Sequence, residues 1–573
     1  MKFSYLRNTL FTFVTYCSFL FIISVFISSC AQQGSPSGGA FDRKPPKVVR
    51  YRPDSASVNF NSKSIEITFD EFVQLQELNS QLLISPPLEF QPEITIKKKT
   101  LIIEFDKKEI LKPNSTYTIR FGKAIRDNHE ATALEDFKYI FSTGSYIDSL
   151  SVAGNVLYAF DHKTEKSITV MLYSDFSDSA IYKKQPEYFD KTNDAGAFKI
   201  TNIRPGKYKI VALKDENSNY KYNEGEVLGF IDTLIEAGKS DALVINLSKE
   251  NQKKFFVKKK QQEGYGKFSF VFSAESDSLG INILNKDQFK GIKQLVQYSK
   301  LKDSITLWID HVDKDSLVIQ TLNGRTILDT VKFKLVKREA ALKSSRNPLK
   351  LIVKNSLSGM VDLNNPLAFT FSQPLVKINE SIPVMLKEDS LAYSKPLVFK
   401  RTDSLFEPVI LTTMQKFTPK TPIAAKSVRN PLLKENTNYS LLILPGTFTD
   451  FFGFANDSLK LMWKTKEEKF YGTLELKVKF ESPSGNYMIQ LLDDKENIVR
   501  QHIISNSETI FYDYLYPQTY KLKVIFDKNK NGRWDPGDYL RKEQPEKTLY
   551  NVEVITIRSN WDLDLEWKIT EPK

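Results

Sequence analysis

The stretch Leu111–Phe121, LKPNSTYTIRF, decides the fold, because it returns later in the chain as Leu433–Ile443, LKENTNYSLLI. A leucine, an asparagine and a tyrosine keep the same spacing in both copies, and alternating apolar residues follow. Apolar side chains at every second position predict a strand with one buried face. The asparagine favours a turn before that strand. The repeat therefore predicts two copies of one β-unit.

Short alternating strands continue outward from this unit. Examples are Ser64–Phe69 (SIEITF), Thr100–Phe105 (TLIIEF) and Tyr208–Leu213 (YKIVAL). Turn residues separate such runs at short intervals, and sustained helical periodicity is scarce. We therefore predict an all-β fold of tandem β-sandwich domains.

A second unit is duplicated as well. The stretch 204–217 (RPGKYKIVALKDEN) recurs as 516–529 (YPQTYKLKVIFDKN), with a proline, a tyrosine and an aspartate in register. The order of units is thus predicted to be A, B, C, A′, B′, where C is a further β-rich module. The predicted boundaries are signal peptide 1–29, flexible tether 30–44, A 45–145, B 147–250, C 262–342, A′ 348–467 and B′ 468–573.

The A units resemble SbsA-type bacterial Ig-like domains. They share the ITFDE-type strand end (67–71 in A), the LKPN-type turn, and an aspartate loop before the last strand, at Asp127 and Asp450. A′ departs from the first motif, because 372–373 reads Ser-Gln where A has an acidic pair. The resemblance implies Ig-like sandwiches for both A units.

The B units look like carboxypeptidase-regulatory or prealbumin-like sandwiches. The similarity rests on 194–208 (DAGAFKITNIRPGKY), and Gln518 replaces the glycine of this motif in B′. The whole order is similar to Ig-like lipoproteins of Bacteroidetes, whose mature chains often begin with a tether like Cys30–Gly39. The resemblance implies a place in the cell envelope and no particular activity.

The N-terminus predicts a lipid anchor. Lys2 and Arg7 precede an uncharged, largely apolar run over Asn8–Ser29, which has the order of a signal peptide. Its end, Ile27–Cys30, resembles a bacterial lipobox, and the resemblance implies that Cys30 is diacylated and becomes the new N-terminus. The alternative is an uncleaved membrane-spanning helix, because the run is nearly long enough to cross a bilayer.

Cleavage would also fix the composition of the mature chain. Cys17 leaves with the signal peptide, so Cys30 would be the only mature cysteine, and the formal charge falls from +12 to +10. Lysine and arginine are spread among acidic residues, so the pattern predicts no nucleic-acid partner. The membrane is the predicted partner through the lipid, at the outer membrane, with the periplasmic and surface faces both open.

A repeated acidic loop is the candidate metal site. Oxygen ligands at loop positions 1, 3, 5, 7, 9 and 12, with glycine at 6, follow the spacing of a Ca²⁺ loop. The candidate ligands in B′ are Asp527, Asn529, Asn531, Arg533 (through its carbonyl), Asp535 and Asp538. The weaker set in B is Asp215, Asn217, Asn219, Asn223 and Glu226. The alternative is a rigid polar hairpin loop built by Asx hydrogen bonds.

Two further patterns are candidate sites. The loop 448–454 (FTDFFGF) is unusually aromatic, so Phe452 and Phe454 either bind a sugar or a partner protein, or fold into the core. Asp-Ser or Asp-Thr followed by a small or aliphatic residue recurs, as at 54–56 and 277–279. This pattern resembles the O-glycosylation acceptor of the same bacterial group, and it is also good turn chemistry.

Signals for an enzyme are weak. The four histidines are far apart, and the sequence has no nucleophile elbow, P-loop or dinucleotide-binding fingerprint. We predict a non-enzymatic envelope lipoprotein, a stalk that binds or scaffolds an unidentified envelope protein or polysaccharide. Two alternatives stay open: a glycan-active enzyme or its accessory subunit, and a calcium-rigidified adhesin. Two carboxylates about 5–10 Å apart in a cleft would favour the enzyme.

Overall fold

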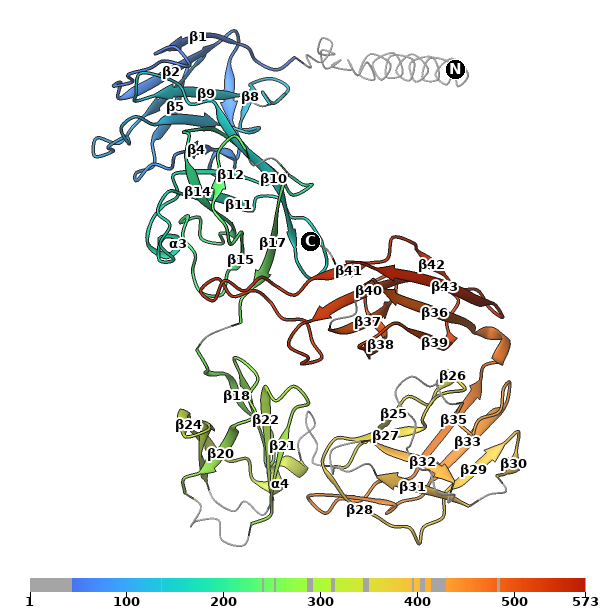
Figure 1. The fold of residues 1–573 in the computed structure, drawn as a ribbon. Coiled ribbons are helices and arrows are strands. Elements are labelled where there is room, and N and C mark those ends of the chain that lie inside the picture. The colour runs from blue at the N-terminus through green and yellow to red at the C-terminus, as the bar shows by residue number, and fades with distance from the viewer. Residues whose placement is uncertain are drawn as a thin grey trace, which may run out of the picture. The chain divides into compact units, whose positions relative to one another are not determined.

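The computed structural model describes residues 44–135, 137–239, 242–251, 254–285, 292–310, 315–343, 350–393, 396–401, 408–413, 429–481 and 485–571. These residues form an all-β fold, as predicted (Figure 1). The chain divides into two compact units, Met1–Asp148 and Ser149–Lys573. The predicted signal peptide, Cys30 and the rest of the predicted tether up to residue 43 lie outside the described residues. Within the described part, no helix is long and apolar enough to cross a membrane.

Segment A packs a four-stranded sheet, ordered β1-β2-β6-β5, with a sheet β4-β7-β9 and a pair β3-β8. Alternate residues of β2 are buried, which matches the period of two in its sequence. The elements are β1 (Val48–Arg52), β2 (Ser64–Phe69), β3 (Val73–Leu75), α2 (Leu78–Gln81), β4 (Leu83–Ser85), β5 (Glu93–Lys97), β6 (Thr100–Glu104), β7 (Thr116–Arg120), β8 (Ile125–Asp127) and β9 (Lys138–Ser142).

Segment A′ repeats this strand order in the second unit. Its sheets run β25-β27-β32-β31 and β26-β35-β33-β29-β30, with the pair β28-β34. The elements are β25 (Val353–Asn355), β26 (Gly359–Val361), β27 (Ala368–Phe371), β28 (Leu375–Ile378), β29 (Met385–Glu388), β30 (Leu391–Ala392), β31 (Leu397–Arg401), β32 (Val409–Thr413), β33 (Asn438–Ile443), β34 (Phe448–Asp450) and β35 (Leu459–Thr465).

The repeated turn explains why both copies fold alike. The hydroxyl of Tyr117 accepts a hydrogen bond from the backbone amide of Lys112 at 2.7 Å. In A′ the hydroxyl of Tyr439 accepts one from the amide of Lys434 at 2.8 Å. Between these partners an asparagine, Asn114 or Asn436, takes a positive φ near 50°. The tyrosine thus ties the turn to the strand that follows it.

The strands of segment B form one continuous sheet, ordered β12-β11-β14-β15-β17-β10-β13, with β16 beside β14. Its middle strand β14 is buried along most of its length. The elements are β10 (Leu150–Tyr158), β11 (Thr169–Tyr173), α3 (Ala180–Lys183), β12 (Tyr188–Lys191), β13 (Ala197–Ile203), β14 (Lys207–Lys214), β15 (Val227–Phe230), β16 (Ile235–Glu236) and β17 (Leu243–Lys249).

Segment B′ lacks a counterpart of the β15-β17 pairing, so its strands form two separate sheets, β38-β37-β40-β41, with β42 beside β40, and β39-β36-β43. Strand β36 is antiparallel to β39 and parallel to β43, just as β10 is to β13 and β17. The elements are η2 (Glu468–Phe470), β36 (Gly472–Phe480), β37 (Asn486–Leu492), β38 (Ile498–Ile504), β39 (Glu508–Leu515), β40 (Thr519–Asp527), β41 (Thr548–Tyr550), β42 (Ile555–Thr556) and β43 (Asp562–Ile569).

Segment C is also β-rich, with sheets β18-β19-β22-β21 and β20-β23-β24. Its first strand begins at Val257, before the predicted boundary at 262. The elements are β18 (Val257–Gly264), β19 (Lys267–Phe272), β20 (Leu279–Ile283), β21 (Gln294–Tyr298), β22 (Ser304–Ile309), β23 (Ser316–Asn323), β24 (Thr326–Lys334) and α4 (Arg338–Leu342).

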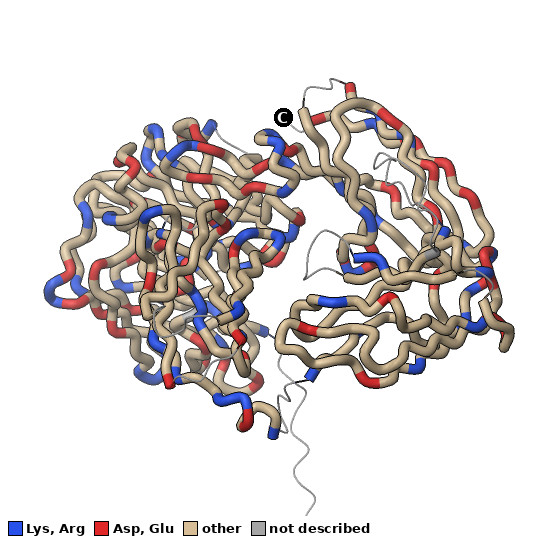
Figure 2. The backbone as a smooth tube through the Cα atoms, turned by 90° about the horizontal axis from the view of Figure 1, so that it is seen from below, with Lys and Arg blue, Asp and Glu red and all other residues tan. Residues whose placement is uncertain are grey.

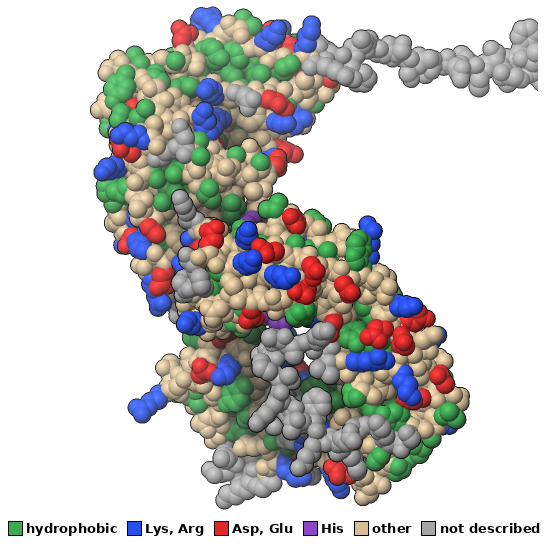
Figure 3. Space-filling model, turned by 45° about the vertical axis from the view of Figure 1, so that its right-hand side comes forward, with side chains coloured by type: hydrophobic (Ala, Val, Ile, Leu, Met, Phe, Trp, Pro, Cys, Tyr) green, Lys and Arg blue, Asp and Glu red, His purple; other side chains and the backbone are tan. Residues whose placement is uncertain are grey.

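Positively and negatively charged residues are mixed along the chain. Figure 2 shows lysine and arginine interleaved with aspartate and glutamate along the backbone. The face drawn in Figure 3 likewise mixes both signs with polar and apolar side chains.

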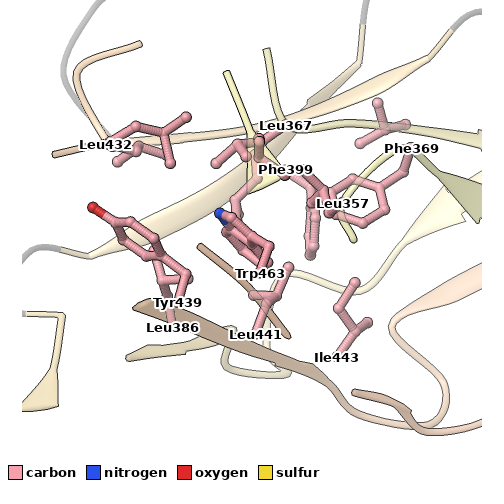
Figure 4. Packing of buried hydrophobic residues seen from close by; sticks show 14 of the residues in the cluster. Leu357, Leu367, Phe369, Leu386, Phe399, Leu432, Tyr439, Leu441, Ile443 and Trp463 are labelled. Atoms are coloured by element: carbon pink, nitrogen blue, oxygen red, sulfur yellow. The ribbon is translucent and has the colours of Figure 1, made fainter. Parts of the chain in front are cut away.

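The core of A′ shows how each sandwich is held together. Figure 4 shows side chains from both sheets meeting between them, among them Phe399, Tyr439 and Trp463. The rings of Tyr439 and Trp463 stack with centroids 5.4 Å apart. Burying rings of this size supplies most of the stabilisation of a sandwich without disulfides.

Candidate functional site

The acidic loop of B′ starts where β40 ends at Asp527. The side chain of Asp527 is 1% exposed. Its Oδ1 accepts a hydrogen bond from the amide of Asn531 at 3.0 Å, and its Oδ2 accepts one from Gly532 at 2.9 Å. Gly532 has a φ of +76°, a conformation that glycine adopts without strain. The first half of the predicted loop therefore curls around its first aspartate.

Three of the predicted ligands meet at one carboxylate. The amide groups of Asn529 and Asn531 donate to Oδ2 of Asp535, at 2.5 and 2.6 Å. The backbone of Arg533 stays in the turn, because its amide donates to Oδ1 of Asn531 at 2.9 Å. The Arg533 side chain forms an ion pair with Glu275 of segment C, and its Nε also lies 4.0 Å from Oδ1 of Asp535.

The last predicted ligand, Asp538, does not join this group. Its side chain accepts a hydrogen bond from the amide of Arg541 at 3.0 Å and faces the guanidinium of the same residue. Glu546, eight residues further on, closes the loop instead. It accepts the amides of Lys528 at 2.7 Å and of Asp535 at 3.1 Å.

Glu546 is the residue that the spacing rule missed. It is 6% exposed, and burial raises its pKa, as do the nearby charges of Asp535 and Asp527. In B the same position is taken by Glu226, which accepts the amides of Glu216 at 3.2 Å and Asn223 at 2.8 Å. The spacing finds Glu226 because its loop is short, whereas an insertion separates Glu546 from the pattern.

The loop of B brings its predicted residues together. Oδ1 of Asp215 accepts the amide of Asn219 at 3.2 Å, and Oδ2 accepts that of Tyr220 at 2.8 Å. Asn217 accepts the same Asn219 amide at 3.1 Å. Tyr220 takes a φ of +59° where B′ has glycine, so both loops follow one backbone path.

The side-chain oxygens of the two loops suit a hard cation, but hydrogen bonds within the chain already hold these side chains in place. Aspartate, glutamate and asparagine oxygens are the ligands that calcium prefers. In the described part of the chain, no group of three or more His, Cys, Asp or Glu side chains is positioned to hold a metal. Calcium binding by either loop stays a prediction.

The aromatic loop of A′ packs against segment C. Phe452 is 3% exposed, and its ring lies 5.4 Å from that of Tyr265 and 6.2 Å from that of Trp308. Phe454 is half-buried beneath the guanidinium of Arg338, which lies 5.1 Å from its ring centroid. Both candidate binding residues are thus placed in a contact between two segments of the same chain.

Asp450, at the start of this loop, is completely buried. Its Oδ1 accepts the amides of Phe452 at 2.9 Å and Phe454 at 2.8 Å. Its Oδ2 has no hydrogen-bond partner among the described residues. Burial raises the pKa of Asp450 to about 6, and the charge of Asp310 adds to the rise.

A second contact joins B′ to B, just beyond the acidic loop. Tyr539 is 1% exposed, and its ring lies 5.2 Å from that of Phe230. Its hydroxyl contacts Nζ of Lys209 at 3.0 Å, and its amide donates to Glu250. The insertion that displaces Glu546 therefore serves to hold B′ on B.

Comparison with known proteins finds a family match for one part of the chain. Residues 42–143 match the family described as a bacterial Ig-like domain, Big_5. No curated protein matches the chain.

Several solved structures show weak similarity. The S-layer protein rSbsC(31-844) is 10% identical, with a TM-score of 0.13, over 89% of this chain and 66% of that chain, just under two thirds of its length. The Bacillus anthracis TIE protein is 10% identical, with a TM-score of 0.13, over 93% of this chain and 76% of that chain. BcpA, the major pilin subunit of Bacillus cereus, is 10% identical, with a TM-score of 0.13, over 73% of this chain and 99% of that chain. Scores this low carry no structural argument. The comparisons therefore show similarity to a bacterial Ig-like domain over residues 42–143, where the turn and aspartate motifs predicted it.

Proposed function

We propose that the protein is a non-enzymatic, lipid-anchored component of the cell envelope that acts as a scaffold and binds an envelope protein or polysaccharide. The scaffold role is supported by two loops that pack against other segments of the same chain. In the second unit, Phe452 packs on segment C and Tyr539 packs on segment B, so both loops stabilise contacts within the chain. A chain that joins its own sandwiches in this way suits a load-bearing or spacing role.

The lipid anchor is the part of the proposal that fixes location. Cys30 would carry the acyl chains and hold the protein at the outer membrane, followed by a Gly- and Ser-rich tether. The match of residues 42–143 to a bacterial Ig-like domain supports a protein built from such domains directly after the tether.

Cell fractionation of Cys30→Ala tests this location. The wild-type chain should sediment with membranes and be released by detergent, whereas the variant should be soluble with an unchanged circular dichroism spectrum. Cys17→Ala is the matched control and should stay with the membrane, because Cys17 lies inside the predicted signal peptide. A Cys30→Ala chain that remains as firmly bound as the wild type would support the uncleaved helix instead.

Calcium rigidification is a second proposal, favoured by the convergence of Asn529 and Asn531 on Asp535. The ion would be held by these residues with Asp527, and Glu546 would replace Asp538 as the closing carboxylate. EDTA should then lower the melting temperature of the wild type. An Asp527→Ala and Asp535→Ala double variant should not respond to EDTA, and a wild type that also ignores EDTA would rule the proposal out.

A further inference from the structure

Segment B′ carries a groove of about 520 Å³ over its three-stranded sheet β39-β36-β43. Acidic and aromatic side chains dominate the lining. Its carboxylates are Glu468, Glu475, Asp513, Asp562 and Asp564. Phe511, which is 41% exposed, and Tyr514 add aromatic surface. Exposed aromatic rings beside carboxylates favour contact with cationic side chains.

Strand register places these groups on one face. Glu475 on β36 lies opposite Phe511 on β39 and beside Asp564 on β43. Thr473, two residues earlier, lies beside Asp562. Because side chains alternate along a strand, these residues point to the same side of the sheet, away from the core formed by Leu474 and its neighbours.

The negative charge of the groove is only partly compensated. Arg429 pairs with Glu468 at 3.2 Å, and Lys477 pairs with Glu475 at 3.3 Å. No lysine or arginine is among the described residues that line the groove itself. Asp562 and Asp564 form no ion pair with a lysine or arginine among the described residues, so the groove keeps negative charge that no cation compensates. A further cation entering the groove would therefore be attracted.

The duplicated segment B lacks this face. Where B′ pairs Glu475 with Phe511, B pairs Ala153 with Lys199. Strands β10, β13 and β17 pair in B as β36, β39 and β43 pair in B′, so the difference on this sheet lies in the side chains. The acidic groove is a property of B′.

The sheet edge is a second feature of the groove. In B, β15 pairs only with the last two residues of β17, through Val227–Lys249 and Leu228–Ser248. The counterpart of β17 in B′, β43, has no second partner strand among the described residues. An edge strand exposes backbone donors and acceptors that can pair with an incoming chain.

We propose that the groove and the β43 edge together bind an extended polypeptide segment with lysine or arginine at every second position. The backbone of this partner would add to the sheet beside β43. Its cationic side chains would then lie along Asp562 and Asp564, on the face of the groove. This inference names a partner for the proposed binding role, but it does not depend on the lipid anchor.

A sugar is the competing ligand for such a groove. Glycoside hydrolysis uses two carboxylates, one of them kept protonated by apolar surroundings. Asp564 is exposed and Glu475 is only half-buried, so neither has such surroundings. Charge complementarity therefore favours the cationic polypeptide.

Fluorescence anisotropy with the full chain in detergent tests the inference directly. The probe is a labelled peptide of eight residues, the length of β43, that alternates lysine and threonine. A peptide of the same composition with its lysines in one block is the first control. We expect the alternating peptide to bind more tightly, and added salt to weaken its binding.

Charge-removing variants then locate the site. Glu475→Gln with Asp564→Asn should weaken binding by about tenfold or more, since both charges lie in the groove. Asp494→Asn with Glu553→Gln removes two exposed charges elsewhere in B′ and should change binding by less than about twofold. Unchanged melting temperatures would show that both variants are folded.

Three results would overturn the inference. Equal weakening by both pairs of substitutions would mean a diffuse attraction to the whole surface. Equal binding of the alternating and blocked peptides would rule out that the peptide adds a strand beside β43. Tighter binding of a neutral oligosaccharide in the same groove would assign it to a sugar. Membrane fractionation of Cys30→Ala is read separately, so failure of the anchor and failure of the groove are distinguishable.

Discussion

The aspartate loops of A and A′ begin from the same motif and end in opposite electrostatic states. In A, Asp127 accepts the amides of His129, Glu130 and Thr132, each at 2.7 Å. Burial opposes its charge, but these hydrogen bonds outweigh it and lower the pKa of Asp127. In A′ burial wins, and the pKa of Asp450 rises to about 6. Hydrogen bonds thus stabilise the charged form of this aspartate in A, whereas burial destabilises the charged form in A′.

Loop length and packing explain the difference. The bridge that closes the loop joins Arg126 to Ala133 in A, but Thr449 to Ala455 in A′, so the second loop is one residue shorter. Only one carboxylate oxygen of Asp450 receives backbone donors, and the other has none among the described residues. The shorter loop presents phenylalanines to segment C instead. Compared with the loop of A, the loop of A′ makes fewer hydrogen bonds to its aspartate and instead contacts another segment.

Phe452→Ala should produce the largest effect, because it removes the ring that contacts Tyr265 and Trp308. We expect the free energy of unfolding of the second unit to fall by about 3–5 kcal/mol, as for other buried phenylalanines. Urea unfolding followed by tryptophan fluorescence would measure it, because all five tryptophans of the chain lie in the second unit. His129→Ala, at the corresponding exposed position of A, should cost less than about 0.5 kcal/mol. Equal costs would mean that Phe452 adds nothing to the contact.

Asp127→Asn should rank second. An asparagine cannot accept all three amides, so one partly buried donor is left unpaired, at a cost of about 2 kcal/mol. The stability that wild-type Asp127 supplies is present above its unfolded pKa and is lost as pH falls through the lowered folded pKa. The variant should therefore lose this acid dependence. Urea titrations of the first unit at about pH 7 and pH 3 would show it.

Asp450→Asn should give the smallest effect, and it should raise the free energy of unfolding instead of lowering it. The folded pKa of Asp450 lies above its ordinary value of 3.8, so stability is lost as pH rises through about 6. Asparagine removes that penalty and should raise the free energy of unfolding by about 1–2 kcal/mol above about pH 7. Urea unfolding of the second unit at several pH values would measure the gain, which should shrink toward about pH 4. A variant that is destabilised at neutral pH, as we expect for Asp127→Asn, would contradict the proposed difference between the two loops.

Much of the fold could be predicted from the sequence. Alternating runs such as Ser64–Phe69 became strands with alternate burial, since period two is a local property of the chain. The repeated turn led to the same hydrogen bond at Tyr117 and Tyr439, because a tyrosine five residues from its partner needs no distant contact. The Ig-like interpretation of A agrees with the family match over residues 42–143.

The candidate sites were predicted less completely. Calcium binding stays a prediction: the structure links Asp527 and Asp535 through Asn531, turns Asp538 toward Arg541, and adds Glu546, which the spacing did not include. A fixed spacing cannot anticipate an insertion whose residues pack elsewhere. The groove over β36 had no signal in the sequence, because Glu475, Phe511 and Asp564 come from three separated strands.

Local sequence patterns are enough to establish the strands, the duplicated turns and the all-β class, because each follows from side-chain periodicity and turn chemistry within a few residues. They also single out Cys30, whose predicted lipidation depends on the residues just before it. Three features required the folded chain: Phe452 faces segment C, Tyr539 enters segment B, and the carboxylates of B′ share one groove. Those outcomes depend on which distant surfaces meet, and burial against a distant surface is a property that no local pattern contains.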